Sequence, residues 1–319
     1  MQPYSEENKS MFYFLLILGV ACALGFQGWR TLLNNFAVQV AGVSGQQMGV
    51  IQGLREVPGF LAFVVIYILF VIKERHLAAG SLLLMGAGIA ATGFFPNYVG
   101  LIITTMIMSF GFHYYETVNQ SLTVQHFSPA QVPLVMGKIR AAMAVSNIVA
   151  SGLMLLLAFV LDFLGMFLVL GVVVALAAAA ALWKNPAGKE AKPQRKGMVL
   201  RKRYWLFYAL TFIAGARRQV FVAFGVFLLV ERFGFSLQEI AGLFLVNNVV
   251  NYFVSPQVGK AINRFGERKV LSVEYAFLVV VFLVYAFTSS KALVAAKLFK
   301  RVRQPWKPRA QATPRISRK

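Results

Sequence analysis

The sequence predicts an all-α protein, a polytopic bundle of transmembrane helices. Hydrophobic residues make up 58% of the 319-residue chain and charged residues only 13%, whereas a soluble domain carries about 25% charged residues. Apolar runs of about 20 residues, the length that crosses a bilayer as a helix, recur along the chain. Lys and Arg gather in the short loops between these runs, which is typical of cytoplasmic loops. Because lipid offers no partner to a free backbone amide, we expect every span to be helical.

Nine runs are long enough to span a membrane. They cover residues 11–33, 46–72, 77–95, 98–123, 138–161, 163–183, 204–231, 236–261 and 270–288. The first run follows a leader with two acidic residues and continues past Ala21-Cys22-Ala23. We therefore expect an uncleaved first span and not a signal peptide.

The loop charges predict the orientation. With a cytoplasmic N-terminus, the cytoplasmic loops ahead of the tail hold 16 Lys and Arg, and the opposite loops hold only Arg232. The positive-inside rule then predicts a multi-pass protein of the cell (plasma or inner) membrane. The net charge of +21 is explained by these loops and the tail, so the expected partner is the lipid bilayer and not nucleic acid.

The longest linker predicts the domain boundary. Residues 184–203 are rich in Lys, Pro and Gly and form a basic cytoplasmic linker. They separate an N-terminal six-helix half, 1–183, from a partial C-terminal half of three helices, 204–288. Residues 289–319 are basic, lack acidic residues and contain three prolines, which predicts a disordered tail.

Two features recur in the same order in both halves. Ser44 and Ser236 each open a span as a helix N-cap, with polar residues in the first turn. Each of these spans ends at a basic loop, Lys73–His76 in the first half and Gly259–Lys269 in the second. The recurrence predicts duplicated halves.

The second loop resembles the loop signature of the major facilitator superfamily. That signature runs Gly, three residues, an acid, Arg, one residue, Gly, one residue and two basic residues. Here Asn263 stands at the acid position and the rest fits. The resemblance implies a six-plus-six inverted or parallel repeat, with an incomplete second half because this chain is expected to be truncated after nine of twelve helices. It also implies a gating loop that helps set the inward–outward equilibrium, made by Gly259, Asn263, Arg264, Gly266, Arg268 and Lys269.

Charged residues inside spans predict the functional site, because each costs about 2.5–3.5 kcal/mol on insertion and such residues commonly line solute or proton pathways. His113, Glu116 and Gln120 share one helical face. Packing ion pairs, snorkelling side chains or an aromatic belt are the alternative explanations. The predicted substrate and proton pathway consists of Arg30, Arg55, Glu56, His113, Glu116, Asn119, Gln120, Arg217, Asn247 and Asn251.

The resemblance implies secondary active transport of a small solute by alternating access. The charged residues in the spans predict that it is coupled to a proton through Glu116, Glu56 or His113. Three arginines in spans favour an anionic solute over a cation. The chain lacks a phosphate-cradling loop, and its single Cys and three His give no metal-ligand spacing. We therefore expect no catalytic residues, metal or cofactor. The alternatives are a non-transporting remnant, scaffold or sensor in the membrane, and a membrane-embedded enzyme acting on lipid.

Overall fold

The computed structural model describes residues 6–129, 131–183, 202–206, 209, 225–265, 269, 272–273 and 276. Within these residues every regular element is a helix, as the sequence predicts. The chain divides into two compact units, Met1–Leu245 and Val246–Lys319. The predicted linker lies almost entirely outside the described residues, as do most of span 270–288 and the tail.

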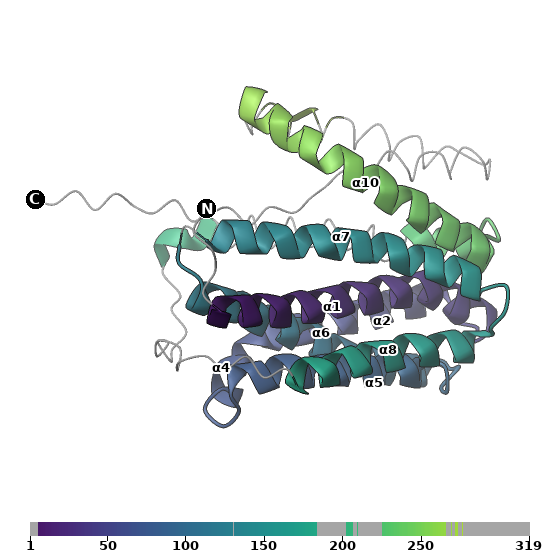
Figure 1. Cartoon of the computed structure of the whole chain (residues 1–319). Helices are drawn as coiled ribbons and strands as arrows, with labels where there is room; N and C mark the ends of the chain where they lie inside the picture. The colour runs from purple at the N-terminus through teal and green to yellow at the C-terminus, as the bar shows by residue number, and fades with distance from the viewer. Residues whose placement is uncertain are drawn as a thin grey trace, which may run out of the picture. The chain divides into compact units, whose positions relative to one another are not determined.

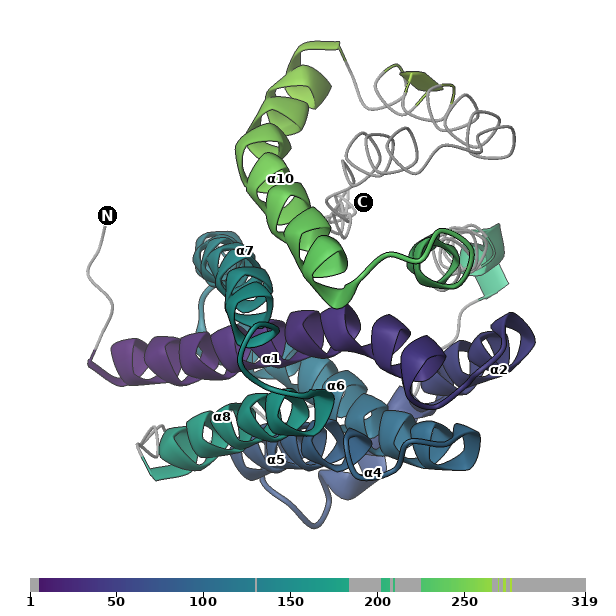
Figure 2. The ribbon, with the colours of Figure 1, turned by 90° about the vertical axis from the view of Figure 1, so that its right-hand side faces the viewer.

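The first unit is a bundle of long helices that run side by side (Figures 1 and 2). Helix α1 packs against α7 and α8, and α5 packs against α6 and α8. The bounds of these helices are α1, Glu6–Gln39; α5, Glu74–Thr92; α6, Tyr98–His126; α7, Val132–Leu157; and α8, Phe163–Trp183. Four stretches in the described part of the chain are long and apolar enough to cross a membrane: Asn8–Gln39, Gly45–Ile68, Val132–Leu157 and Phe163–Trp183.

Glycines allow α5 to approach its neighbours closely. A Cβ on Gly88 would lie 2.4 Å from the backbone nitrogen of Met108 in α6. On the other side of α5, a Cβ on Gly86 would lie 2.8 Å from the carbonyl oxygen of Gly171 in α8. Membrane helices commonly associate through such small residues, because the hydrophobic effect does not drive helices together in lipid. The position of α6, which carries His113, is therefore set by backbone-to-backbone contact with α5.

The second predicted span is broken into pieces. It consists of α2 (Gly45–Arg55), α3 (Val57–Phe60), the 3₁₀ turn η1 (Leu61–Val64) and α4 (Val65–Ile68). Pro58 lies in the first turn of α3. Proline removes one backbone donor and clashes with the preceding turn, so a helix breaks just before it. The break places Arg55 and Glu56 at its edge.

The break leaves backbone groups that find new partners. The amide of Gly59 bonds the carbonyl of Glu56 at 3.0 Å, not that of Arg55. The Ser109 hydroxyl of α6 donates a hydrogen bond to the freed Arg55 carbonyl. A buried carbonyl needs such a partner in an apolar surround. Ser109 therefore joins the break to α6.

The two predicted N-caps are confirmed. The Ser44 side chain accepts from the amide of Gln47, and the Gln47 side chain accepts from the amide of Ser44. Ser236 and Glu239 make the same reciprocal pair, at 3.2 and 2.8 Å. Both are capping boxes, which satisfy two amides at a helix start. The two matching spans of the repeat thus begin with the same local structure.

Helix α10, Leu237–Phe265, continues past the predicted end of its span at residue 261. The break between the two compact units falls within it, after Leu245. Gly259 and Asn263 consequently belong to its last turns, and a tight turn can begin only after Phe265. The reason is that residues 257–265 contain no proline, and a lone glycine is tolerated inside a helix.

Candidate substrate and proton pathway

Arg55 is the centre of the candidate site. It lies at the end of α2, is 5% exposed, and its Nε donates to Gln52 Oε1 at 2.9 Å. Its Nη2 forms an ion pair with the carboxylate of Glu56. A buried guanidinium is stable only when it is paired and hydrogen-bonded. The helix break gives Arg55 both kinds of partner on its own helix.

His113 extends this pair across to α6. Its Nε2 lies 4.0 Å from Glu56 Oε2, and the ring faces Gly59 of α3, where a Cβ would lie 3.0 Å from it. The Nε2 atom is buried and has no hydrogen-bond partner among the described residues. At this distance the carboxylate and the imidazole are close enough to interact electrostatically, although they do not form a direct hydrogen bond. The structure thus brings together Arg55, Glu56 and His113.

The ring of Phe26 in α1 connects two guanidinium groups. The guanidinium carbon of Arg30 lies 5.9 Å from its centroid and that of Arg55 lies 5.7 Å from it. Phe26 also stacks on Phe112 of α6, with ring centroids 4.4 Å apart. Cations over aromatic faces gain about 0.5–2 kcal/mol. The ring therefore helps hold two positive groups within one small region.

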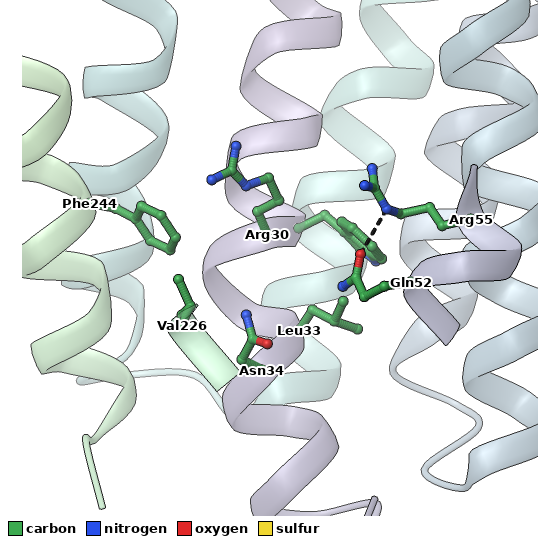
Figure 3. A pocket seen from close by; sticks show the side chains of 8 residues that line it. Arg30, Leu33, Asn34, Gln52, Arg55, Val226 and Phe244 are labelled. Atoms are coloured by element: carbon green, nitrogen blue, oxygen red, sulfur yellow. Dashed lines mark hydrogen bonds between the residues drawn. The ribbon is translucent and has the colours of Figure 1, made fainter. Parts of the chain in front are cut away.

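A small cavity lies beside these groups (Figure 3). Its volume is about 20 Å³, which is enough for roughly one water molecule. Helices α1 and α2 supply most of its wall. The lining residues are Trp29, Arg30, Leu33, Asn34, Gln52, Arg55, Val226 and Phe244.

Two cavity-lining residues have polar atoms without hydrogen-bond partners. Trp29 is 1% and Asn34 6% exposed. Neither the indole Nε1 of Trp29 nor the Oδ1 of Asn34 has a partner within the described part of the chain. Most buried polar groups in proteins are hydrogen-bonded, so each exception calls for an explanation.

The sequence reasoning missed Trp29, Asn34, Gln52 and Ser109. A signal existed for Gln52, which lies three residues before Arg55 and so on the same helical face. Asn34 also stands out as a polar residue near the end of an apolar run. Trp29 and Ser109 resemble ordinary packing residues in sequence. Only the fold places Trp29 in the cavity wall and Ser109 on the Arg55 carbonyl.

The residues on the predicted polar face of α6 differ in how far they are buried. Glu116 and Gln120 are exposed in the first unit, whereas His113 is half-buried. Asn119 is half-buried and its Oδ1 has no partner among the described residues. Glu116 lies close enough to Cys22 of α1 and to Tyr115 to interact with them electrostatically. From this face, His113 contacts the Glu56 group.

Of the remaining predicted residues, Arg217 lies in the first unit and the others lie in the second. Asn247 is buried, and its Oδ1 has no hydrogen-bond partner among the described residues. Asn251 is half-buried. Arg264 is exposed, with its guanidinium 5.2 Å from the Phe265 centroid, and Lys269 is also exposed. Only the helical backbone of Gly259 and Asn263 is described, and Arg217, Gly266 and Arg268 lie outside the described residues.

The Major Facilitator Superfamily profile matches residues 9–299. The chain therefore belongs to the Major Facilitator Superfamily. It is a multi-pass membrane transport protein and not an enzyme, as the sequence predicts.

Solved transporters share its fold at low sequence identity. The nucleoside transporter NupG matches with a TM-score of 0.67 and 16% identity over 92% of this chain and 78% of NupG. A single-substitution variant of NupG matches with a TM-score of 0.71 and 14% identity over 92% and 79%. An inward-facing, unoccupied bacterial homologue of the human lysosomal transporter Spinster matches with 0.63 and 13% over 94% and 74%. Among curated protein sequences, none matches this chain.

Proposed function

We propose that this protein is a proton-coupled secondary transporter of a small anionic solute, working by alternating access. The observation that most strongly supports this proposal is the group formed by Arg55, Glu56 and His113. Arg55 is paired with Glu56, and Glu56 lies 4.0 Å from a ring nitrogen of His113. The pair lies at a helix break beside a cavity that Arg55 itself lines.

The coupling follows from the charge of Arg55. While Glu56 is ionised, it neutralises the guanidinium. When Glu56 takes a proton, Arg55 loses its counter-charge, and a buried unpaired charge is strongly unfavourable. An anion from the cavity then replaces the carboxylate as the partner of Arg55. Proton and anion are thus bound together, and release of the proton on the other side restores the original pair and expels the anion.

The helix break supports the conformational part of the proposal. A span divided at Glu56 and Pro58 has irregular backbone at the site, and transporters commonly place binding sites at such discontinuous helices. The gating loop, through Arg264 and Lys269, is proposed to act at the far end of α10. It would set the balance between the inward-facing and outward-facing states.

Glu56→Gln tests the proposal in proteoliposomes that contain the full chain. The amide mimics the protonated carboxyl. We therefore expect uptake of labelled small organic anions, tested as a panel, to lose its response to an imposed pH gradient while exchange of internal for external solute continues. Glu116→Gln is measured beside it, because Glu116 is the second carboxylate of the predicted pathway.

The outcomes separate the competing ideas. Loss of coupling in Glu56→Gln alone supports the proposal as stated. Loss only in Glu116→Gln moves the coupling site to the exposed face of α6. Gradient-driven accumulation that persists in Glu56→Gln rejects the role of the Arg55–Glu56 pair, and no uptake by the wild-type chain of any solute supports the non-transporting alternative.

A further inference from the structure

We propose that Gln52 is a positioning residue for proton coupling. Its neutral amide holds the guanidinium of Arg55 without neutralising it, so the charge balance at Arg55 depends on the protonation of Glu56. Gln52 and Arg55 lie three positions apart on α2, and their side chains therefore share one face of that helix. This inference rests on the proposed proton-coupled transport and adds the residue that lets the Arg55–Glu56 pair respond to a proton.

Two side-chain partners of Arg55 differ in charge. Oε1 of Gln52 accepts a hydrogen bond from Nε at 2.9 Å, a contact marked by the dashed line in Figure 3. The carboxylate of Glu56 pairs with Nη2. Arginine presents its donors on separate edges of one planar group, so an amide and a carboxylate bind it at the same time. Of these two partners, Glu56 alone carries a charge that a proton removes.

The burial of the three side chains gives them different roles. Gln52 is 7% exposed, and the side chain of Arg55 is 6% exposed, whereas the side chain of Glu56 is 31% exposed. A proton can therefore reach Glu56 while the contact between the amide and the guanidinium stays out of water. A hydrogen bond in such surroundings is electrostatically stronger than one in water. Gln52 can thus keep Arg55 in place after Glu56 has been neutralised.

The amide of Gln52 is itself oriented by its own helix. Its Nε2 donates to the Sδ atom of Met48, one turn earlier, at 3.8 Å. A thioether sulfur accepts hydrogen bonds and cannot donate them. The amide nitrogen is therefore directed toward Met48 and the amide oxygen toward Arg55. Met48 is fully buried, so packing holds this arrangement.

Charged and titratable groups from two other helices face the pair. Arg30 of α1 lines the same cavity wall as Arg55, and a ring nitrogen of His113 of α6 lies 4.0 Å from Glu56. Neither group brings a negative charge. A carboxylate at position 52 would therefore add a second counter-charge and keep Arg55 neutralised when Glu56 takes a proton. Because a buried unpaired charge is strongly unfavourable, the neutral amide makes Arg55 sensitive to that proton.

Gln52→Glu tests the inference, because it keeps the shape and the acceptor oxygen and adds a negative charge. The full chain is placed in proteoliposomes, and uptake of a panel of labelled small organic anions is measured with and without an imposed pH gradient. We expect the gradient to raise uptake by the wild type, and to change uptake by Gln52→Glu less than about twofold, since Arg55 keeps a counter-charge. The readout is the ratio of the two uptakes within one sample, so partial loss of folded protein does not imitate the effect.

The matched control is Gln47→Glu in the same helix. Gln47 is the third residue of the capping box that begins at Ser44, and Glu serves that position as well as Gln does. The control adds the same charge to α2 away from Arg55, and it should keep the response of the wild type. Gln52→Leu removes the acceptor and leaves the charge unchanged. We expect it to lower uptake, because Nε of Arg55 loses its partner, and to keep the ratio of the wild type.

The outcomes separate this inference from the proposed function. Loss of the response in Gln52→Glu, with the response kept in Gln47→Glu and Gln52→Leu, supports the inference. A response of wild-type size in Gln52→Glu, together with its loss in Glu56→Gln, overturns the role of Gln52 and leaves the proposed coupling standing. Equal loss in Gln52→Leu assigns Gln52 a purely structural role, and equal loss in Gln47→Glu assigns the effect to any charge on α2; either result overturns the inference. A response retained in Glu56→Gln, or no uptake by the wild-type chain, overturns both proposals.

Discussion

Gly88→Ala is expected to force α5 and α6 apart. The new Cβ would lie 2.4 Å from the backbone nitrogen and 2.8 Å from the Cα of Met108. Ordinary contact begins near 3.4 Å, so the helices must separate by about 1 Å at this point. Backbone atoms cannot rotate away, and a gap of that size forfeits a quarter to a half of each dispersion contact around it. Overpacking of this kind costs about 1–3 kcal/mol.

The matched control is Gly80→Ala in the same helix, where a Cβ would meet nothing within 4 Å. Both variants gain the same helix propensity of about 1 kcal/mol, so their difference isolates the contact with α6. We expect Gly88→Ala to melt about 2–12 °C below Gly80→Ala in detergent. Its uptake should also fall, because Met108 adjoins Ser109, which holds the break in the second span. Equal melting temperatures would refute the role of this contact.

Two further predictions concern hydrogen bonds of α6. Ser109→Ala should destabilise the protein by about 1–3 kcal/mol, since the freed Arg55 carbonyl loses its partner. Thr105→Val is the control one turn away, because its buried hydroxyl has no partner among the described residues; it should be neutral or stabilising, and equal losses in both would contradict the reasoning. Glu74→Ala should lower the melting temperature through loss of the bonds from Gln125 at 2.8 and 2.7 Å, by about 1–2 kcal/mol because the pair is only partly buried. Ser121 also donates to Glu74, at 3.1 Å, so Gln125→Ala should have a smaller effect than Glu74→Ala. If the double variant melts close to Glu74→Ala, thermal melting confirms the contact; additive losses would reject it.

Much of the fold could be predicted because hydrophobic pattern and loop charge act locally. The caps at Ser44 and Ser236 could be predicted because a capping box depends only on two residues three positions apart in the sequence. The end of α10 was predicted less accurately, because residues 257–265 contain a glycine that is typical of a loop but is helical in the structure. The proline at 58 predicted a kink, and the structure shows a break over several short helices.

The candidate site was predicted only in part. Arg55, Glu56 and His113 stood out because charges are costly in lipid, but their mutual contact depends on how α2 and α6 pack. Glu116 stood out for the same reason and lies on an exposed face. The predicted roles of Asn247, Asn251 and the gating residues stay predictions.

The sequence by itself determined that this is a helical membrane protein with duplicated features, because spans, caps and loop charges are set by residues near one another in the chain. Only the tertiary structure decided which polar groups meet. Gly88 and Gly111 let α5 and α6 approach closely, and Ser109 then reaches the freed carbonyl of Arg55. The pairing of Glu56 with His113 also comes from contact between helices that are distant in the sequence. Hydrogen bonds act over about 3 Å, so a site built from several helices exists only once those helices are packed.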